Sequence, residues 1–285
     1  MKKDEFIDYL NSYTDGELAF EKLINQREFF RINTLKTTPK GFLKFSKLQT
    51  AKTNVWENAF EYQDKIPIGK TWEYFLGYLH PQSLTSMLPA LILNPKERED
   101  VLDLTAAPCG KTTQISAMMR NTGVIVANDV PEKEKSMFGN IKRLGALNII
   151  IITKDAKNFK IRERFDKVLL DAPCSALGGE KAAHLRYTKE MSYSLSTIQK
   201  MMILNAFDSV KNGGEMVYST CTFAKEENEE VIQFLLEKRG EAKLIPIKLD
   251  IKKEKGIDGL DDAVRIYPQH LNSEGFFIAK IKKVL

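Results

Sequence analysis

Cysteine and histidine are scarce in this sequence of 285 residues, with three of each. The cysteines are Cys109, Cys174 and Cys221, and their odd number and wide spacing argue against a framework of disulfide bonds. No C-x-x-C pair is present and the three histidines are equally dispersed, so the ligand spacing of a zinc ribbon is missing. We therefore predict no metal site.

Long apolar runs and a strong charge bias are also lacking. No stretch approaches the roughly eighteen apolar residues of a membrane span, and the segment Met1–Phe6 is charged where a signal peptide would be apolar. These absences predict a cytoplasmic protein with no membrane partner. The 43 Lys and Arg against 38 Asp and Glu leave a net charge of +5. This mild excess is compatible with a polyanionic partner but does not establish one.

From about residue 85 the sequence alternates short apolar runs with amphipathic segments, a pattern typical of strands and helices in turn. Repeated βαβ units of this kind predict an α/β fold with a doubly wound, mostly parallel sheet over residues 76–285. One predicted helix spans about 196–211 and is ended by the Asn-Gly-Gly run at 212–214. The predicted strands end near Leu104, Ala127, Ile152, Asp171 and Thr220.

Residues 1–75 predict a small α+β module. The apolar residues recur with a helical period from residue 1 to about 30, which predicts a helical segment. A strand-like run and a helix over 39–48 are predicted to follow. Just beyond the module, Tyr78 and Gln82 are candidates to contact a ligand. The module also carries basic residues that could touch phosphates, although charge alone does not distinguish this from a solvated face: Arg31, Lys36, Lys40, Lys44 and Lys47.

The loop Thr105–Thr112 follows the first predicted strand and departs from a P-loop by one residue, since Thr105 stands where the first glycine belongs. ATP binding is therefore an alternative. Pro108 argues against it, because proline has no N–H to donate to a phosphate.

Asp129 ends the second strand at the spacing of a carboxylate that binds ribose, and Asp155 follows the third, where it could meet an adenine edge. Either acid alone is as often a turn or cap residue. Together with a loop that offers N–H groups to a carboxylate, they fit S-adenosylmethionine better than ATP.

Two of the cysteines follow buried strands: Cys174 comes after Asp171-Ala-Pro, and Cys221 after the strand that reaches Thr220. Because the carboxyl ends of parallel strands line one crevice, we expect the two thiols to face each other there. A single free cysteine is more often a small buried apolar residue. A pair at two strand ends, one of them after Asp-Ala-Pro, favours chemistry.

This arrangement is suited to methylation of cytosine at carbon 5. A thiolate that adds to carbon 6 makes carbon 5 nucleophilic enough to attack a methyl sulfonium. Asp171 is a candidate acid near ring nitrogen 3, and a second cysteine could assist release of the first.

Motifs that match a known family cover most of the chain: Arg31–Lys36, Pro81–Ser83, Asp103–Thr112, Asn128–Asp129, Asp171–Ser175, Tyr218–Thr222, Glu226–Glu229, Arg265–Pro268 and Gly275–Phe277. The sequence at these positions closely resembles the Sun/Fmu family of RNA cytosine-5 methyltransferases. The resemblance implies a class I, Rossmann-like methyltransferase fold, an RNA-binding role for residues 1–75, and S-adenosylmethionine as the cofactor. It implies that Cys221 is the nucleophile and that Cys174 and Asp171 are the other catalytic residues, Cys174 serving product release. It also implies these cofactor-binding residues: Thr105, Ala106, Ala107, Pro108, Cys109, Gly110, Lys111, Asp129, Asp155 and Asp171.

Several positions depart from the family pattern. Cys109 replaces the usual glycine, which predicts a side chain where the backbone approaches the methionine end of the cofactor, and Glu134 replaces a common arginine. The length and N-terminal pattern are similar to those of compact archaeal-type members that modify tRNA, so the implied partner is tRNA, with no DNA partner. The alternatives are an rRNA methyltransferase and a non-catalytic RNA-binding protein with a relic methyltransferase fold.

Overall fold

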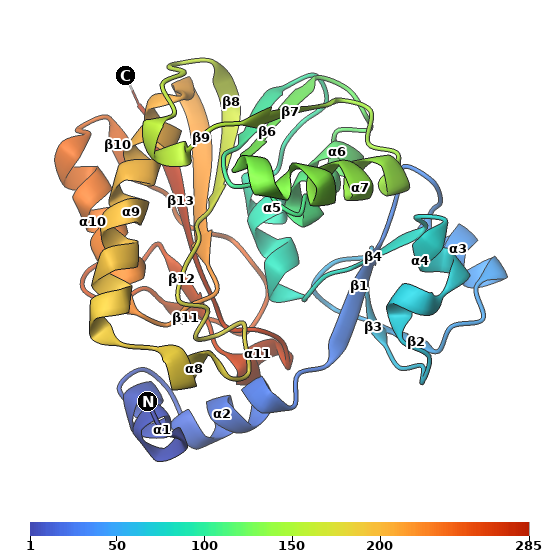
Figure 1. The fold of residues 1–285 in the computed structure, drawn as a ribbon, viewed down its shortest axis with the longest axis horizontal. Helices are drawn as coiled ribbons and strands as arrows, with labels where there is room; N and C mark the ends of the chain where they lie inside the picture. The colour runs from blue at the N-terminus through green and yellow to red at the C-terminus, as the bar shows by residue number, and fades with distance from the viewer. Residues whose placement is uncertain (285) are drawn as a thin grey trace.

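The computed structural model describes residues 1–284, which form two sheets (Figure 1). The larger sheet has the order β11-β12-β13-β9-β8-β5-β6-β7, with β10 paired to β13. Strands β9, β8, β5, β6 and β7 run parallel, whereas β13 is antiparallel to β9. The predicted α/β class with a mostly parallel sheet is therefore confirmed. The strands are β5 Asp100–Asp103, β6 Val124–Asp129, β7 Ile149–Thr153, β8 Phe165–Asp171, β9 Val210–Thr220, β10 Ala242–Leu244, β11 Glu254–Lys255, β12 Val264–Ile266 and β13 Phe276–Lys283.

Helices cover both faces of this sheet. Successive strand residues point to opposite sides, so each strand offers apolar side chains to the helices on both faces. In β8, Val168 and Leu170 pack with α9, whereas Leu169 between them packs with α5 and α6. Burial on both faces explains why these strands are continuous apolar runs in the sequence. The helices are α5 Leu88–Leu93, α6 Gly110–Met118, α7 Glu134–Leu144, α8 Ala183–Arg186, α9 Lys189–Asp208, α10 Glu229–Lys238 and α11 Pro268–Leu271, with 3-10 turns at Thr85–Met87, Pro131–Lys133, Ala156–Asn158 and Lys225–Glu227.

The predicted bounds of one helix are wrong. The helix α9 begins at Lys189, where the Thr188 hydroxyl accepts a hydrogen bond from Met191 N at 3.1 Å, and it already ends at Asp208. The Asn-Gly-Gly run at 212–214 lies within β9 next to an irregular register with β8, and Gly213 has a φ of 78°. These glycines therefore serve a strand irregularity and not a helix end.

The smaller sheet has the antiparallel order β2-β3-β1-β4. Its last strand reaches Pro81, past the predicted module boundary at 75. Its elements are β1 Glu28–Ile32, α3 Pro39–Phe45, β2 Thr50–Lys52, β3 Ala59–Tyr62, a 3-10 turn Ile68–Lys70, α4 Trp72–Phe75 and β4 Leu79–Pro81.

The expected single helical stretch at the amino end consists of two helices, α1 Lys3–Asn11 and α2 Gly16–Ile24. Asp15 begins the second helix by accepting a hydrogen bond from Leu18 N at 3.0 Å. Both helices pack on the larger unit, where Phe6 and Phe20 contact the cluster of Leu177 and Tyr187. Figure 1 shows them beneath α8, away from α3 and α4.

Arg31 joins the smaller sheet to the larger unit. Its guanidinium is fully buried and donates to Gln82 Oε1 at 2.9 Å, Gly110 O at 3.0 Å and Thr113 Oγ1 at 2.7 Å. Burial, together with the nearby Arg143 charge, lowers the pKa of Arg31 to about 9. The expectation that Arg31 touches phosphates is therefore wrong, because it holds β1 against the start of α6. In residues 1–284 no helix is both long and apolar enough to cross a membrane.

Candidate active site

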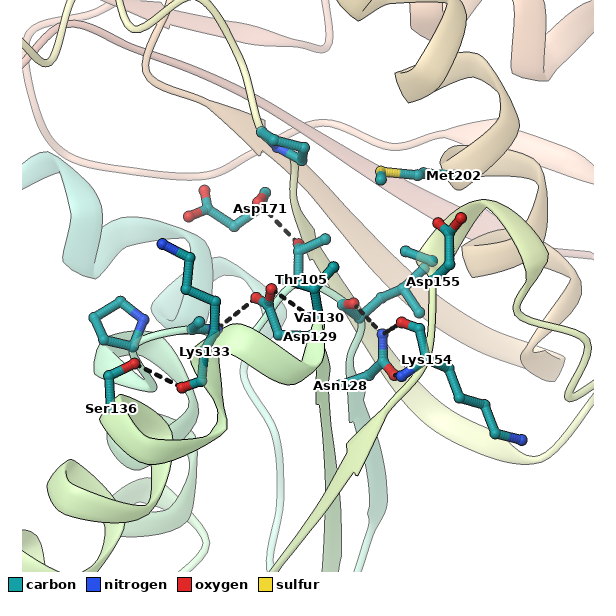
Figure 2. Close-up of a pocket in the computed structure, with 15 residues that line it drawn as sticks. Thr105, Asn128, Asp129, Val130, Lys133, Ser136, Lys154, Asp155, Asp171 and Met202 are labelled. Carbon is teal, nitrogen blue, oxygen red and sulfur yellow. Dashed lines mark hydrogen bonds between the residues drawn. The ribbon is translucent and has the colours of Figure 1, made fainter.

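The carboxyl ends of the parallel strands border a pocket of about 640 Å³ (Figure 2). The buried side chain of Asn128 ties three of these ends together. Its amide donates to Leu104 O and Lys154 O at 2.9 Å each and accepts from Lys154 N at 3.0 Å. The loops that follow β5, β6 and β7 are thus held as one wall. A volume of this size is typical of a site for a nucleotide-sized ligand.

All three acids predicted for the cofactor site, Asp129, Asp155 and Asp171, line this pocket, as do Thr105, Ala107 and Pro108. Asp129 also accepts hydrogen bonds from Ala107 N and Val130 N at 2.8 Å, so it holds the loop after β5 in place. Asp155 caps the next turn by accepting from Lys157 N at 2.9 Å. Each acid therefore has a structural partner and also faces the pocket, and ionised carboxylates keep further acceptor capacity for ligand hydroxyls.

A second cavity of about 230 Å³ shares Thr105, Ala107, Pro108 and Asp171 with the first, so the two adjoin. Ala106, Gly110 and Lys111 line this smaller cavity and not the larger one. Gln82 lines it too, as predicted, whereas Tyr78 lines neither cavity and packs on Phe45 with ring centroids 5.0 Å apart. The expectation of a ligand contact by Tyr78 therefore receives no support from the structure.

Cys109 lines neither cavity. Its side chain is fully buried in a cluster with Ala106, Ala127 and Met137. Burial raises the pKa of Cys109 to about 12, which makes it inert as a nucleophile. Its φ of 73° is the left-handed conformation that glycine adopts without strain, which fits the glycine that the resemblance implies at this position. The predicted intrusion of this side chain at the methionine end is therefore wrong, because it points into the core.

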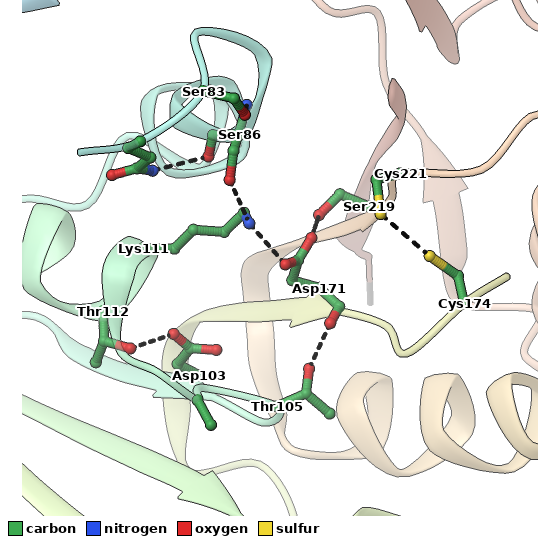
Figure 3. A network of polar contacts seen from close by, with 12 residues as sticks. Ser83, Ser86, Asp103, Thr105, Lys111, Thr112, Asp171, Cys174, Ser219 and Cys221 are labelled. Carbon is green, nitrogen blue, oxygen red and sulfur yellow. Dashed lines mark hydrogen bonds and ion pairs between the residues drawn. The ribbon is translucent and has the colours of Figure 1, made fainter. Parts of the chain in front are cut away.

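The two other thiols meet near Asp171, a residue that lines both cavities, although neither thiol is itself among the lining residues (Figure 3). Asp171 and Ser219 are paired in the register of β8 and β9, so the residues that follow these strands leave the sheet together. The Sγ atoms of Cys174 and Cys221 lie 3.5 Å apart. A Cβ on Gly179 would stand 3.1 Å from the Cys221 Sγ, so a larger residue there would crowd this sulfur. The structure thus brings the two predicted thiols together.

Asp171 is the centre of a polar network next to the thiols. Its carboxylate accepts from Lys111 Nζ at 2.6 Å and from Ser219 Oγ at 2.7 Å, and its backbone carbonyl accepts from Thr105 Oγ1 at 2.9 Å. Lys111 also donates to Ser86 Oγ at 2.8 Å. Burial would lower the pKa of Lys111, but the charge and hydrogen bond of Asp171 outweigh it and raise the pKa. Lys111 therefore stays cationic and fixes the carboxylate.

Sequence reasoning missed two carboxyl groups at the smaller cavity. Burial raises the pKa of Asp103 to about 7; one of its oxygens accepts from Thr112 Oγ1 at 2.7 Å, and the other has no partner. Burial also raises the pKa of Glu274, which accepts from Ser83 Oγ at 2.5 Å. Glu274 precedes β13, whose pairing with β9 brings it near Cys221. The Gly275–Phe277 motif was the available signal for Glu274, but only the pairing places it at the thiols.

Comparisons with known proteins agree with this geometry. The family model described as 16S rRNA methyltransferase RsmB/F matches residues 90–282. The chain belongs to this family. The resemblance predicted from the motifs is confirmed. The two thiols, together with Asp171, Lys111 and Ser219, lie within the matched residues 90–282.

Among curated relatives of this RsmB/F family member, a tRNA (cytosine(49)-C(5))-methyltransferase of Pyrococcus abyssi is 38% identical. The match includes 90% of this chain and 88% of the length of that enzyme. A human 28S rRNA (cytosine(4447)-C(5))-methyltransferase is 41% identical over 78% of this chain, which spans 29% of that protein. Ribosomal RNA small subunit methyltransferase F of Vibrio vulnificus is 37% identical over 90% of this chain and 58% of its own length. The chain thus spans only part of several of its relatives.

Solved structures show the same architecture. NSun6 from Pyrococcus horikoshii, solved with SFG, matches with a TM-score of 0.88 and 26% identity over 99% of this chain and 98% of its own. PH0851 matches with a TM-score of 0.89 and 29% identity over 97% of this chain and 65% of its own. The likeness extends over both sheets of the present chain.

The thiol pair leads to a prediction about ionisation. The hydrogen bond to Cys174, followed by burial and the nearby Glu274 and Asp171 charges, raises the pKa of Cys221 well above its ordinary value. Two sulfurs this close do not both ionise easily, so the pair retains one proton. In Cys174→Ala the largest cause is removed, and the midpoint of Cys221 alkylation by iodoacetamide is expected to shift to lower pH. Mass spectrometry of the Cys221 peptide across a pH series measures this shift.

The matched control for the alkylation series is Cys109→Ala, which removes a buried thiol outside both cavities. It should leave the Cys221 midpoint unchanged. A midpoint that stays fixed or rises in Cys174→Ala would show that the contact with Cys174 is not what raises the pKa of Cys221.

Proposed function

We propose that this protein transfers a methyl group from S-adenosylmethionine to carbon 5 of a cytosine in tRNA, through a covalent bond between Cys221 and the base. The observation that carries the proposal is the 3.5 Å approach of two thiols beside Asp171, next to a nucleotide-sized pocket. A thiolate is the nucleophile that this chemistry needs, and a carboxylate beside it can accept a hydrogen bond from the exocyclic amine of the base.

The larger pocket fits S-adenosylmethionine by the chemistry of its lining. Asp129 and Asp155 offer carboxylates for ribose hydroxyls and an adenine edge, and Thr105 and Ala107 bring the loop to the junction with the smaller cavity. When bound, this cofactor supplies an electrophilic methyl group. The related NSun6 structure contains SFG, an S-adenosylmethionine analogue, which supports the same ligand class here. The P-loop alternative is not favoured, because Pro108 stands in the loop and lines the pocket.

Cys221, Asp171 and Cys174 then have separate roles in the reaction. The Cys221 thiolate adds to carbon 6, and the displaced electron pair makes carbon 5 nucleophilic while Asp171, fixed by Lys111 and Ser219, binds the base. After carbon 5 gains its methyl group, a general base must accept the proton of carbon 5, which frees the electron pair of that C–H bond. The double bond between carbons 5 and 6 then re-forms and the bond from carbon 6 to the Cys221 sulfur breaks. The Cys174 thiol, 3.5 Å away, can give its proton to the departing sulfur.

The target cytosine must be unpaired or extruded to reach these thiols, since carbons 5 and 6 are stacked inside a helix. The RNA class rests on the Pyrococcus abyssi tRNA enzyme, which this chain matches along nearly the whole of both proteins. The rRNA relatives are matched over smaller shares of their own length, and they make rRNA the second candidate. A relic fold without catalysis is not favoured, because the thiols converge and Cys109 points away from them.

Incubation of the purified protein with methyl-labelled S-adenosylmethionine tests the proposal. We expect label in unmodified tRNA transcripts, with bisulfite sequencing placing it at one cytosine position, and little label in fragments of small- and large-subunit rRNA. Strong labelling of rRNA alone would overturn the tRNA assignment. Absence of label from both, with the cofactor shown to bind by calorimetry, would overturn the activity.

A further inference from the structure

The outer end of the smaller unit carries aromatic side chains that the core does not use. Trp72 and Phe75 of α4 are 75% and 69% exposed, and Phe45 at the end of α3 is 48% exposed. Single exposed aromatics are ordinary, but a cluster of them marks an interaction site.

These residues lie together although they are distant in sequence. Ser46, directly after α3, donates its hydroxyl to Glu73 of α4 at 2.7 Å, and Phe45 packs on Tyr78 just beyond α4. The rings of Trp72 and Phe75 meet edge to face with centroids 6.0 Å apart. Figure 1 shows α3 and α4 side by side at the end of the molecule away from α9 and α10. We call Phe45, Trp72 and Phe75 the aromatic face.

Lysines flank Phe45 of the aromatic face in the sequence. Residues 36–56 contain five lysines and no Asp or Glu, and the first acid after them, Glu57, lines a hollow together with Lys40, Lys44 and Lys52. All five lysines are exposed. Glu73, within α4, is engaged by Ser46. Lys36 is partly engaged, because it donates to Leu76 O and Arg143 O, which leaves four for an external anion: Lys40, Lys44, Lys47 and Lys52.

We propose that the aromatic face and these lysines bind unpaired nucleotides of the substrate RNA other than the target cytosine. Exposed aromatic rings stack on unpaired bases, and lysines beside them neutralise the phosphates between those bases. A second copy of this chain fits poorly, because self-association would bring the same positive surface on both partners together. The inference rests on the proposed function for the identity of the RNA. Arg31 connects the aromatic face to the candidate active site, because this residue fixes the smaller sheet against the loop that borders both cavities.

The fluorescence of Trp72 can be used to test the proposal, because the chain has only two tryptophans and the other is Trp56. In Trp56→Phe, titration with a ten-nucleotide oligoadenylate should quench Trp72 fluorescence in a saturable and salt-dependent way. Oligoadenylate contains no cytosine, so it reports on this surface and not on the chemistry. In Lys44→Gln/Lys47→Gln the binding should weaken, and the slope of its logarithmic salt dependence should become shallower by about one for each phosphate that is no longer neutralised.

The second arm measures methyl transfer to tRNA. Trp72→Ala/Phe75→Ala should raise KM roughly 10-fold, leave kcat near its original value and leave S-adenosylmethionine binding unchanged by calorimetry. The matched control is Leu147→Ala, which truncates an 83% exposed apolar side chain of the larger unit and should leave KM unchanged.

Failure of this inference is distinct from failure of the proposed function. A protein that methylates tRNA but shows no quenching of Trp72 by RNA, and no change of KM in the double variant, would overturn the inference alone. Quenching by increasing protein concentration or by acidic phospholipid vesicles, without quenching by oligoadenylate, would overturn it in favour of self-association or a membrane surface.

Discussion

Replacing Cys221 with alanine is expected to lower methyl transfer to RNA by roughly 10³-fold or more, the scale seen when a covalent nucleophile is removed. Without a thiolate at carbon 6, carbon 5 of cytosine is too weak a nucleophile to take the methyl group. Cys221 follows β9 directly and its sulfur faces that of Cys174, so the substitution removes the reacting atom without changing the strand. Transfer of labelled methyl groups to tRNA, with cofactor binding followed by calorimetry, measures the effect.

Cys109→Ala is the matched control, since it makes the same substitution at a thiol that is fully buried in a core cluster, whereas Cys174 and Cys221 are partly exposed. It should retain methyl transfer at a rate close to that of the unchanged protein. Full activity in Cys221→Ala would show that Cys221 is not the nucleophile and would leave Cys174, the other thiol of the pair, as the candidate.

Replacing Cys174 with alanine is expected to trap the protein on its RNA. The first half of the reaction needs Cys221, whereas release needs a proton for the departing sulfur, and the Cys174 thiol is 3.5 Å from it. The variant should therefore form a covalent protein–RNA complex that survives boiling in detergent and migrates as a slower band on a denaturing gel. Turnover should fall to about one methyl group or fewer per protein molecule.

The double variant Cys174→Ala/Cys221→Ala controls this experiment, because it lacks the atom that forms the covalent bond and should give no slower band. A slower band in Cys221→Ala, and none in Cys174→Ala, would reverse the roles of the two sulfurs. That outcome would correspond to the use of the Pro-Cys thiol as the nucleophile.

Much of the site could be predicted because its residues sit at strand ends, and strand ends are local features of a sequence. Apolar runs bounded by turn residues placed Asp129, Asp155 and Asp171 correctly after consecutive parallel strands. The start of α9 was missed because Thr188 precedes a segment of mixed polarity with little amphipathic contrast. The glycines at 213 and 214 were misread because a turn signal looks the same at a helix end and at an irregular strand.

Apart from the convergence of Cys174 and Cys221, which their strand ends predicted, contacts between distant segments were beyond sequence reasoning. Ser86 and Lys111 meet across 25 positions, and Ser83 and Glu274 across 191. Packing also decided the direction of the Cys109 side chain, since a residue with positive φ can point its Cβ into the core or into the cavity. Nothing in the local sequence distinguishes those two outcomes.

The sequence by itself determined the order of strands and helices, the loop after β5 and the position of each thiol at the end of its strand, because these follow from short-range periodicity and turn chemistry. Only the tertiary structure decided that Cys174 and Cys221 touch, that Lys111 fixes Asp171, and that Arg31 is a buried tie and not a phosphate ligand. The physical reason is that parallel pairing of β8 with β9, and the burial that accompanies it, join residues about fifty positions apart, and the free energy of such contacts depends on the whole packed core.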